Sequence, residues 1–117
     1  SSDLVNAERA DGRQIAGVGG QVDFFRGARA SPGGVSIVAM PSCTRTASRI
    51  LPALPAGTPV STSRNDVDYV VTEYGVAPLR NRSEGERVDA LIAIAHPRHR
   101  DELRASTRHG MALPPAA

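Results

Sequence analysis

The stretch Gly34-Val-Ser-Ile-Val-Ala-Met-Pro41 decides the fold class of this chain. Residues 35–40 form an apolar run of strand length, and Pro41 ends it because proline cannot donate to a strand ladder. An apolar run without polar alternation is typical of a strand in a parallel sheet that is covered on both faces. We therefore expect a strand over residues 35–40 that is buried on both sides.

Other segments add strands and turns around this one. Short runs bounded by turn residues predict four further strands: Val5–Ala7, Gln14–Ala16, Val60–Thr62 and Tyr69–Thr72. Arg64–Asp66 is predicted as a polar turn, Ser31–Gly34 as a glycine turn and Gly75–Leu79 as a connector.

Three helices are expected beside these strands. Residues 22–28 have modest amphipathicity, and Ser83 followed by Glu86 forms a capping-box pattern that starts a helix over Glu84–Ala95. Apolar residues at 88, 91, 92 and 95 give that helix one apolar stripe. Pro97 begins a last helix through about Arg108, with Gly110 as its C-terminal cap. Strands mixed with helices predict an α/β fold with an open sheet flanked by helices.

Composition narrows the function classes. The 117 residues are enough for one domain with a small core of Val, Ile, Leu and Ala, since aromatic residues make up only 3%. A net charge of +2, spread along the chain, does not indicate nucleic-acid binding. Cys43 is the single cysteine, so no disulfide framework is expected, and no apolar stretch is long enough to span a membrane.

The glycine cluster Gly17-Val-Gly-Gly20 precedes the first expected helix. Glycine backbone can approach a ligand closely, and loops at helix starts bind anions or oxyanions. A dinucleotide fingerprint fails because Val22 stands where its third glycine belongs, and a phosphate loop fails because no Lys follows. The loop is therefore either a ligand-facing element or a tight turn.

Three segments together resemble one family: Gly17-Val-Gly-Gly-Gln-Val-Asp-Phe24, Ser63-Arg-Asn-Asp-Val-Asp-Tyr-Val-Val-Thr-Glu-Tyr-Gly-Val-Ala77 and Ile94-Ala-His-Pro97. Their order and spacing resemble the C-terminal part of the acetyl-CoA hydrolase and acetate (4-hydroxybutyrate) CoA-transferase family. The resemblance extends from about Asp3 to about Leu103. It implies a CoA-transferase-like fold, here as an incomplete domain over residues 1–110, followed by a flexible tail over 111–117.

The resemblance also implies a chemistry. In the family a glutamate attacks the acyl-CoA carbonyl and becomes a glutamyl-CoA thioester, which conserves the thioester energy for transfer. That glutamate lies in a segment upstream of residue 1, so the chain is expected to be inactive alone. The implied partners are acyl-CoA, a small carboxylate, the N-terminal part of the enzyme and, as one option, a second copy in a homodimer. Coenzyme A is implied as substrate; no metal, nucleic acid or membrane is expected, and the location is expected to be cytoplasmic.

Five residues match the family's site. By resemblance, the backbone N–H of Gly20 contributes to the oxyanion hole, and Gly17, Gly19, Gly20 and Gln21 face CoA. Arg45 falls where some members carry a cation near CoA phosphates, although an exposed loop arginine is an equal interpretation.

Other polar residues are interpreted structurally. Glu73 at a strand end is either a site-lining carboxylate or, as we favour, a structural one that accepts backbone N–H bonds or pairs with an arginine. His96 is expected to pack or cap at a helix end rather than to bind metal. Arg64, Asp66 and Asp68 are expected to form a structural salt-bridge network.

A rival interpretation comes from a different class of function. Because none of the five glutamates matches the nucleophile, the chain can also be a non-catalytic CoA-binding or interaction module.

Overall fold

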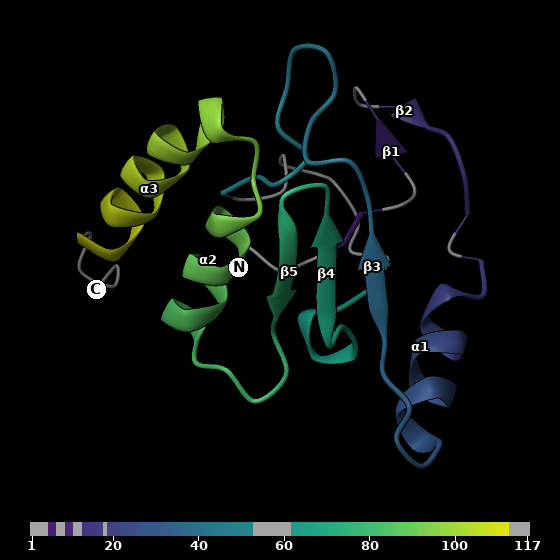
Figure 1. Ribbon diagram of the computed structural model, residues 1–117. Helices are drawn as coiled ribbons and strands as arrows, with labels where there is room; N and C mark the ends of the chain where they lie inside the picture. The colour runs from purple at the N-terminus through teal and green to yellow at the C-terminus, as the bar shows by residue number, and fades with distance from the viewer. Residues whose placement is uncertain (1–4, 7–8, 11–12, 18, 53–61, 113–117) are drawn as a thin grey trace, which may run out of the picture.

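The computed structural model describes residues 5–6, 9–10, 13–17, 19–52 and 62–112. Two small sheets, three α-helices and one short 3-10 helix occupy these residues (Figure 1). In chain order the elements are β1 (Arg9–Ala10), β2 (Arg13–Gln14), α1 (Gln21–Ala30), β3 (Ile37–Ala39), the 3-10 helix η1 (Arg64–Asp66), β4 (Tyr69–Thr72), β5 (Gly75–Pro78), α2 (Glu84–Ala93) and α3 (Pro97–Ala112).

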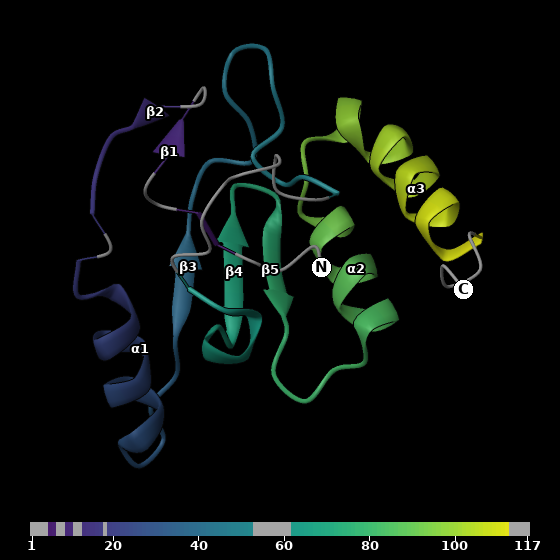
Figure 2. The same ribbon diagram turned by 180° about the vertical axis from the view of Figure 1, so that it is seen from behind.

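The main sheet has three strands in the order β3-β4-β5. β3 runs parallel to β4, and β4 runs antiparallel to β5 across a two-residue turn. The register places Val38 beside Val70, and Val70 beside Ala77. Helix α1 lies beside β3 at one side of the molecule, and α2 and α3 lie at the other side, in both views (Figures 1 and 2).

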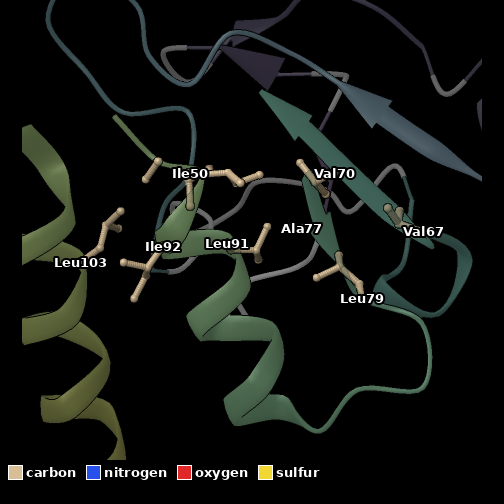
Figure 3. Close-up of a cluster of buried hydrophobic side chains, with 10 residues drawn as sticks. Ile50, Val67, Val70, Ala77, Leu79, Leu91, Ile92 and Leu103 are labelled. Atoms are coloured by element: carbon tan, nitrogen blue, oxygen red, sulfur yellow. The ribbon is translucent and has the colours of Figure 1, made fainter. Parts of the chain in front are cut away.

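The core lies between the sheet and α2. Val70 and Ala77 point from the sheet toward Leu91 and Ile92 of α2 (Figure 3). The expected apolar stripe is confirmed for Val88, Leu91 and Ile92, which pack in this cluster, but the helix ends at Ala93 rather than at the expected Ala95, which is buried just beyond it. The capping box is confirmed as well, because the Ser83 hydroxyl accepts from the Glu86 N–H and the Glu86 carboxylate accepts from the Ser83 N–H.

A buried carboxylate joins the amino ends of β3 and β4. Asp68 is 1% exposed, and its carboxylate accepts from the Ser36 N–H at 2.9 Å. It also forms ion pairs with Arg29 of α1 at 3.3 Å and with Arg80 after β5 at 3.9 Å. Asp66 pairs with Arg26 of α1 at 3.4 Å. A salt-bridge network at these aspartates is confirmed.

The part that Arg64 was expected to play in this network stays a prediction. The arginines that pair with the two aspartates are Arg26, Arg29 and Arg80, and the side chain of Arg64 lies outside the described part of the chain.

The expectation that β3 is buried on both faces is wrong. Ile37 is 49% exposed, and Ala39 is exposed, whereas Val38 between them packs against the core. Within the described residues the core packs on the Val38 face of the sheet, whereas on the opposite face Ile37, Ala39 and Val76 are exposed and the other three side chains are half-buried.

Two boundaries also differ from expectation. Gly75–Leu79 is not a connector, because residues 75–78 form strand β5, where Pro78 is tolerated at a sheet edge. Helix α3 continues past Gly110 to Ala112, since one helical glycine costs only about 1 kcal/mol.

The N-terminal strands shift as well. The hairpin strands are 9–10 and 13–14, closer to the turn than expected, while Val5 forms a single bridge to Thr62. Residues 7 and 60–61 of the expected strands lie outside the described part.

Gly34 provides a test of this packing. A Cβ at this position would lie 1.7 Å from the Ala28 carbonyl oxygen, so Gly34→Ala must displace the turn between α1 and β3. We expect the free energy of unfolding to fall by about 1–3 kcal/mol or more, as in overpacked cores. Gly27→Ala is the control, because its Cβ meets nothing within 4 Å, and it should stabilise α1 by up to about 1 kcal/mol. Urea unfolding followed by circular dichroism measures both; equal stabilities would contradict the assigned turn.

Candidate functional site

The polar segments of interest meet at the carboxyl edge of the sheet. Because β3 and β4 are parallel, the loop at 41–48 and the turn at 73–74 leave the sheet on the same edge (Figure 1). The N-terminus of α1 points toward this edge too, since α1 runs opposite to β3 (Figures 1 and 2). Crevices at the carboxyl ends of parallel strands are common ligand sites in α/β folds.

The glycine loop forms the start of α1. Gly20 is the N-cap residue, and no side chain caps this helix end. The first N–H groups of a helix lack intrahelical partners, so they are available to an acceptor outside the helix. Gly17, Gly19 and Gly20 are all exposed, which leaves the backbone of this loop accessible.

The need for glycine differs between the two neighbours. Gly19 has φ +64°, a conformation that side chains disfavour, whereas Gly20 has φ −97°. A Cβ at Gly20 would only contact the ring of Phe24 at 3.5 Å, and that ring is 79% exposed. The backbone conformation therefore favours glycine at position 19, while nothing in the described packing requires it at position 20.

Gln21 is held by a contact that joins distant parts of the chain. Its side-chain oxygen accepts from the Thr62 hydroxyl at 2.7 Å, and Thr62 is 1% exposed. Thr62 in turn exchanges two backbone hydrogen bonds with Val5. The predicted CoA-facing glutamine therefore anchors the start of α1 to the segment before η1.

Ser42 and Glu73 join the carboxyl ends of β3 and β4. The Glu73 carboxylate accepts from the Ser42 hydroxyl at 2.5 Å and from the Ser42 N–H at 2.9 Å. The Ser42 hydroxyl, followed by backbone N–H groups of Glu73 and Ser42, holds the pKa of Glu73 below its ordinary value; the charge of His96 adds to this, and desolvation opposes it. Glu73 is therefore an ionised structural carboxylate, as we favoured.

Aromatic and cationic side chains surround the turn after β4. The Tyr74 ring lies edge-on to His96, with 5.5 Å between the centroids, and Arg100 lies 5.4 Å above Tyr74. His96 accepts the N–H of Arg98 through Nδ1, which caps the start of α3 as expected. The guanidinium of Arg98 donates to the carbonyls of Thr44 and Arg45, so α3 supports the loop that carries Arg45.

The structure distributes the predicted site residues over two places on this edge. Gly17, Gly19, Gly20 and Gln21 lie at the start of α1, and Arg45 is exposed in the loop after β3. Ser42 was missed from the sequence, where a serine after a strand-ending proline carries no signal of a partner 31 residues away.

Two further facts concern other kinds of site. Among the described residues, no three His, Cys, Asp or Glu side chains are grouped so that they could hold a metal ion. In the same part of the chain no helix has the length and apolar character needed to cross a membrane.

Comparison with known proteins gives one consistent result. Residues 3–107 match the family described as the acetyl-CoA hydrolase/transferase C-terminal domain. The chain is 57% identical to the 4-hydroxybutyrate coenzyme A transferase of Clostridium kluyveri over 93 residues, which are 78% of this chain and 22% of that protein. It is 36% identical to the acetyl-CoA hydrolase of Yarrowia lipolytica over 97 residues, 80% of this chain and 18% of that protein.

A solved structure agrees with these matches. RipA from Yersinia pestis superposes with a TM-score of 0.83 at 43% identity, over 94% of this chain and 25% of that one. The expected α/β architecture of a CoA-transferase piece is confirmed. The chain spans about a fifth to a quarter of the proteins that it matches.

The Ser42–Glu73 link predicts a pH-dependent stability difference. A lowered carboxyl pKa stabilises the fold at pH above the unfolded value near 4.5, and this stabilisation is lost as the pH falls through the folded pKa. Glu73→Gln should therefore lower the melting temperature at neutral pH, and the difference from wild type should shrink in acid.

A double-mutant cycle with Ser42→Ala separates the pairing from other effects. Because the two residues act together, the combined variant should lose less than the sum of the single changes. Melting curves between about pH 3 and 7 measure this; a Glu73→Gln effect that stays constant with pH, or fully additive changes, would exclude the pairing.

Proposed function

The chain belongs to the acetyl-CoA hydrolase/transferase C-terminal domain family, and from this premise we propose that it is the C-terminal part of an enzyme that moves CoA between an acyl-CoA and a small carboxylate, or to water. In that enzyme it supplies the glycine loop at 17–21 as an oxyanion and CoA-facing element. The observation that carries this proposal is the uncapped, exposed N-terminus of α1 at the carboxyl edge of the sheet.

The electrostatics of this helix start favour a carbonyl over a phosphate. Unpaired N–H groups and the helix dipole attract negative charge, but Asp23 already places one carboxylate in the first turn. A full phosphate charge is disfavoured by that neighbour. A thioester carbonyl is neutral at first and develops charge only in the transition state, which is the situation where fixed backbone donors accelerate a reaction.

The loop after β3 is the proposed position for the polar end of CoA. Arg45 is exposed there, and Arg98 fixes its carbonyl, so the backbone under this cation is held in place. An arginine can pair with phosphate oxygens through two N–H groups.

We also propose a cytoplasmic location, because Cys43 is the single cysteine and the fold uses no disulfide.

One observation favours the alternative of a non-catalytic module. Glu73, a glutamate at this edge, accepts two hydrogen bonds from Ser42, which reduce the nucleophilicity of its carboxylate. In this proposal the nucleophile comes from outside this chain, as the family mechanism implies. Without it the chain would bind CoA or a partner and catalyse nothing.

A chimaera tests the two alternatives. In it, this chain replaces the matching segment of the Clostridium kluyveri transferase, and thioester exchange between an acyl-CoA and a small carboxylate is followed by chromatography. We expect turnover by the chimaera and none by the chain alone. A folded chimaera that is inactive, beside an active parent, would favour the non-catalytic module.

Gly20→Val in this chimaera tests the glycine loop. The added side chain should crowd the acyl group and lower kcat by about 10²-fold, the scale of losing one oxyanion donor, with a smaller effect on CoA affinity. Gly27→Val is the matched control in the same helix, where a Cβ meets nothing within 4 Å, and kcat should be retained. Near-normal kcat in folded Gly20→Val would show that the loop is only a structural turn.

A further inference from the structure

Within the described part of the chain, one side-chain hydrogen bond joins the first turn of α1 to another element. The Thr62 hydroxyl donates to the Gln21 side-chain oxygen at 2.7 Å, and the two residues are 41 positions apart in the sequence. Gln21 is the first residue of the helix and directly follows the N-cap residue Gly20. The bond therefore acts on the same turn whose backbone N–H groups are exposed and uncapped.

Burial contributes little to holding this helix in place. None of the side chains of α1 is fully buried, and Phe25 is the one that packs partly against the core cluster. The later turns are held by the ion pairs of Arg26 and Arg29 with the two aspartates described above. Because these ion pairs lie beyond the first turn, the position of the first turn depends on the bond to Thr62.

Thr62 is a fixed anchor for this bond. It is 1% exposed, and its backbone exchanges two hydrogen bonds with Val5, at 3.1 and 3.2 Å. A buried hydroxyl needs a partner, because a buried polar group without one destabilises the fold. The Gln21 oxygen is the partner that the structure gives it, so the glutamine side chain cannot swing toward a ligand without leaving this hydroxyl unpaired.

We propose that Thr62 and Gln21 are a positioning pair for catalysis at the glycine loop. Through the glutamine side chain, the buried hydroxyl fixes the direction of the backbone N–H groups at the start of α1. Direction matters because backbone donors stabilise an oxyanion only where they aim at the developing charge, and a misplacement of about 1 Å can cost about 10² in rate. This inference rests on the proposed function, and it gives the Gln21 side chain a supporting role rather than contact with CoA.

Removing the hydroxyl in the chimaera described above tests the pair. Thr62→Val keeps the branched shape of the side chain but loses its donor, so kcat should fall roughly tenfold while the KM for acyl-CoA changes less than about twofold. Thr62→Ser keeps a hydroxyl and should retain kcat within about threefold. Thr107→Val is the matched control, because the Thr107 hydroxyl bonds carbonyls of its own helix α3, and kcat should be unchanged.

A double-mutant cycle distinguishes support from direct contact with the substrate. Gln21→Met keeps the length of the side chain but accepts only weak hydrogen bonds, so it should lower kcat as Thr62→Val does. Combining the two changes should lower kcat no further than either change alone. A glutamine that touched CoA would instead raise the KM when it is replaced, whatever residue stands at position 62.

Hydrogen exchange in this chain alone reports on the same pair without any turnover. The Phe24 N–H donates to the Gly20 carbonyl at 3.0 Å, which closes the first turn of α1. Its protection, measured by NMR, should fall roughly threefold or more in Thr62→Val and in Gln21→Met, because the turn loses one hydrogen bond of ordinary strength. The Ser31 N–H at the other end of the helix should keep its protection.

The outcomes separate the positioning pair from the proposed function. Unchanged kcat in an active chimaera that carries Thr62→Val overturns the pair and keeps the catalytic proposal. An equal loss of kcat in Thr62→Ser, or a raised KM when Gln21 alone is replaced, also overturns the pair. If the chimaera has no turnover, lost protection of the Phe24 N–H keeps the pair as the support of the helix start and rejects the catalytic proposal, whereas unchanged protection rejects both.

Discussion

The carboxylate of Asp68 is the constraint on which the arrangement of this chain depends. It lies buried just before β4, and α1, the residue before β3 and the segment after β5 each supply it with a contact. The backbone of the same residue accepts from Leu79 at 2.8 Å, which closes β5 against β4. A buried charge of this kind is tolerated only when it is paired and hydrogen-bonded, so the positions of Arg29, Ser36 and Arg80 are fixed together. The glycine loop is placed through this network, because it begins the helix that carries Arg29.

The two edges of the sheet are held in different ways. At the amino edge charged pairs around Asp68 and Asp66 fasten α1. At the carboxyl edge a single carboxylate, Glu73, fixes the loop after β3, and Arg98 supports that loop from α3. The start of α1 keeps its backbone exposed, although the ion pairs of Asp66 and Asp68 hold this helix and the Glu73 hydrogen bonds hold the neighbouring loop. A rigid support beneath an open, uncapped helix end is the arrangement that electrostatic catalysis by backbone donors requires.

Local patterns in the sequence predicted those elements whose signals lie within a few residues. The capping box and stripe of α2 and the bounds of β4 are in this group. Strand β5 was missed because Gly75 and Pro78 are turn-like residues, and only pairing with β4 makes them a strand. The contacts of Gln21 with Thr62 and of Ser42 with Glu73 join residues 41 and 31 positions apart, so no spacing rule could indicate them. The burial of β3 was predicted on both faces because an apolar run carries no alternation that would mark an exposed side, whereas Ile37 and Ala39 are exposed among the described residues.

The parallel pairing of β3 with β4 has a consequence for the route by which the chain folds. The β4–β5 hairpin closes across two residues, and α2 follows it directly, so these contacts need little loop entropy. β3 can dock only when Ser36 meets Asp68, 32 positions further along the chain. Closing this longer loop costs more entropy, so we expect this step to be slower. We expect the hairpin and α2 to form the nucleus and β3 with α1 to join late, an order that φ-values at Ala77 and Val38 would reveal or refute. The glycine loop then belongs to the last segment to assemble, so its geometry is complete only when the whole sheet is.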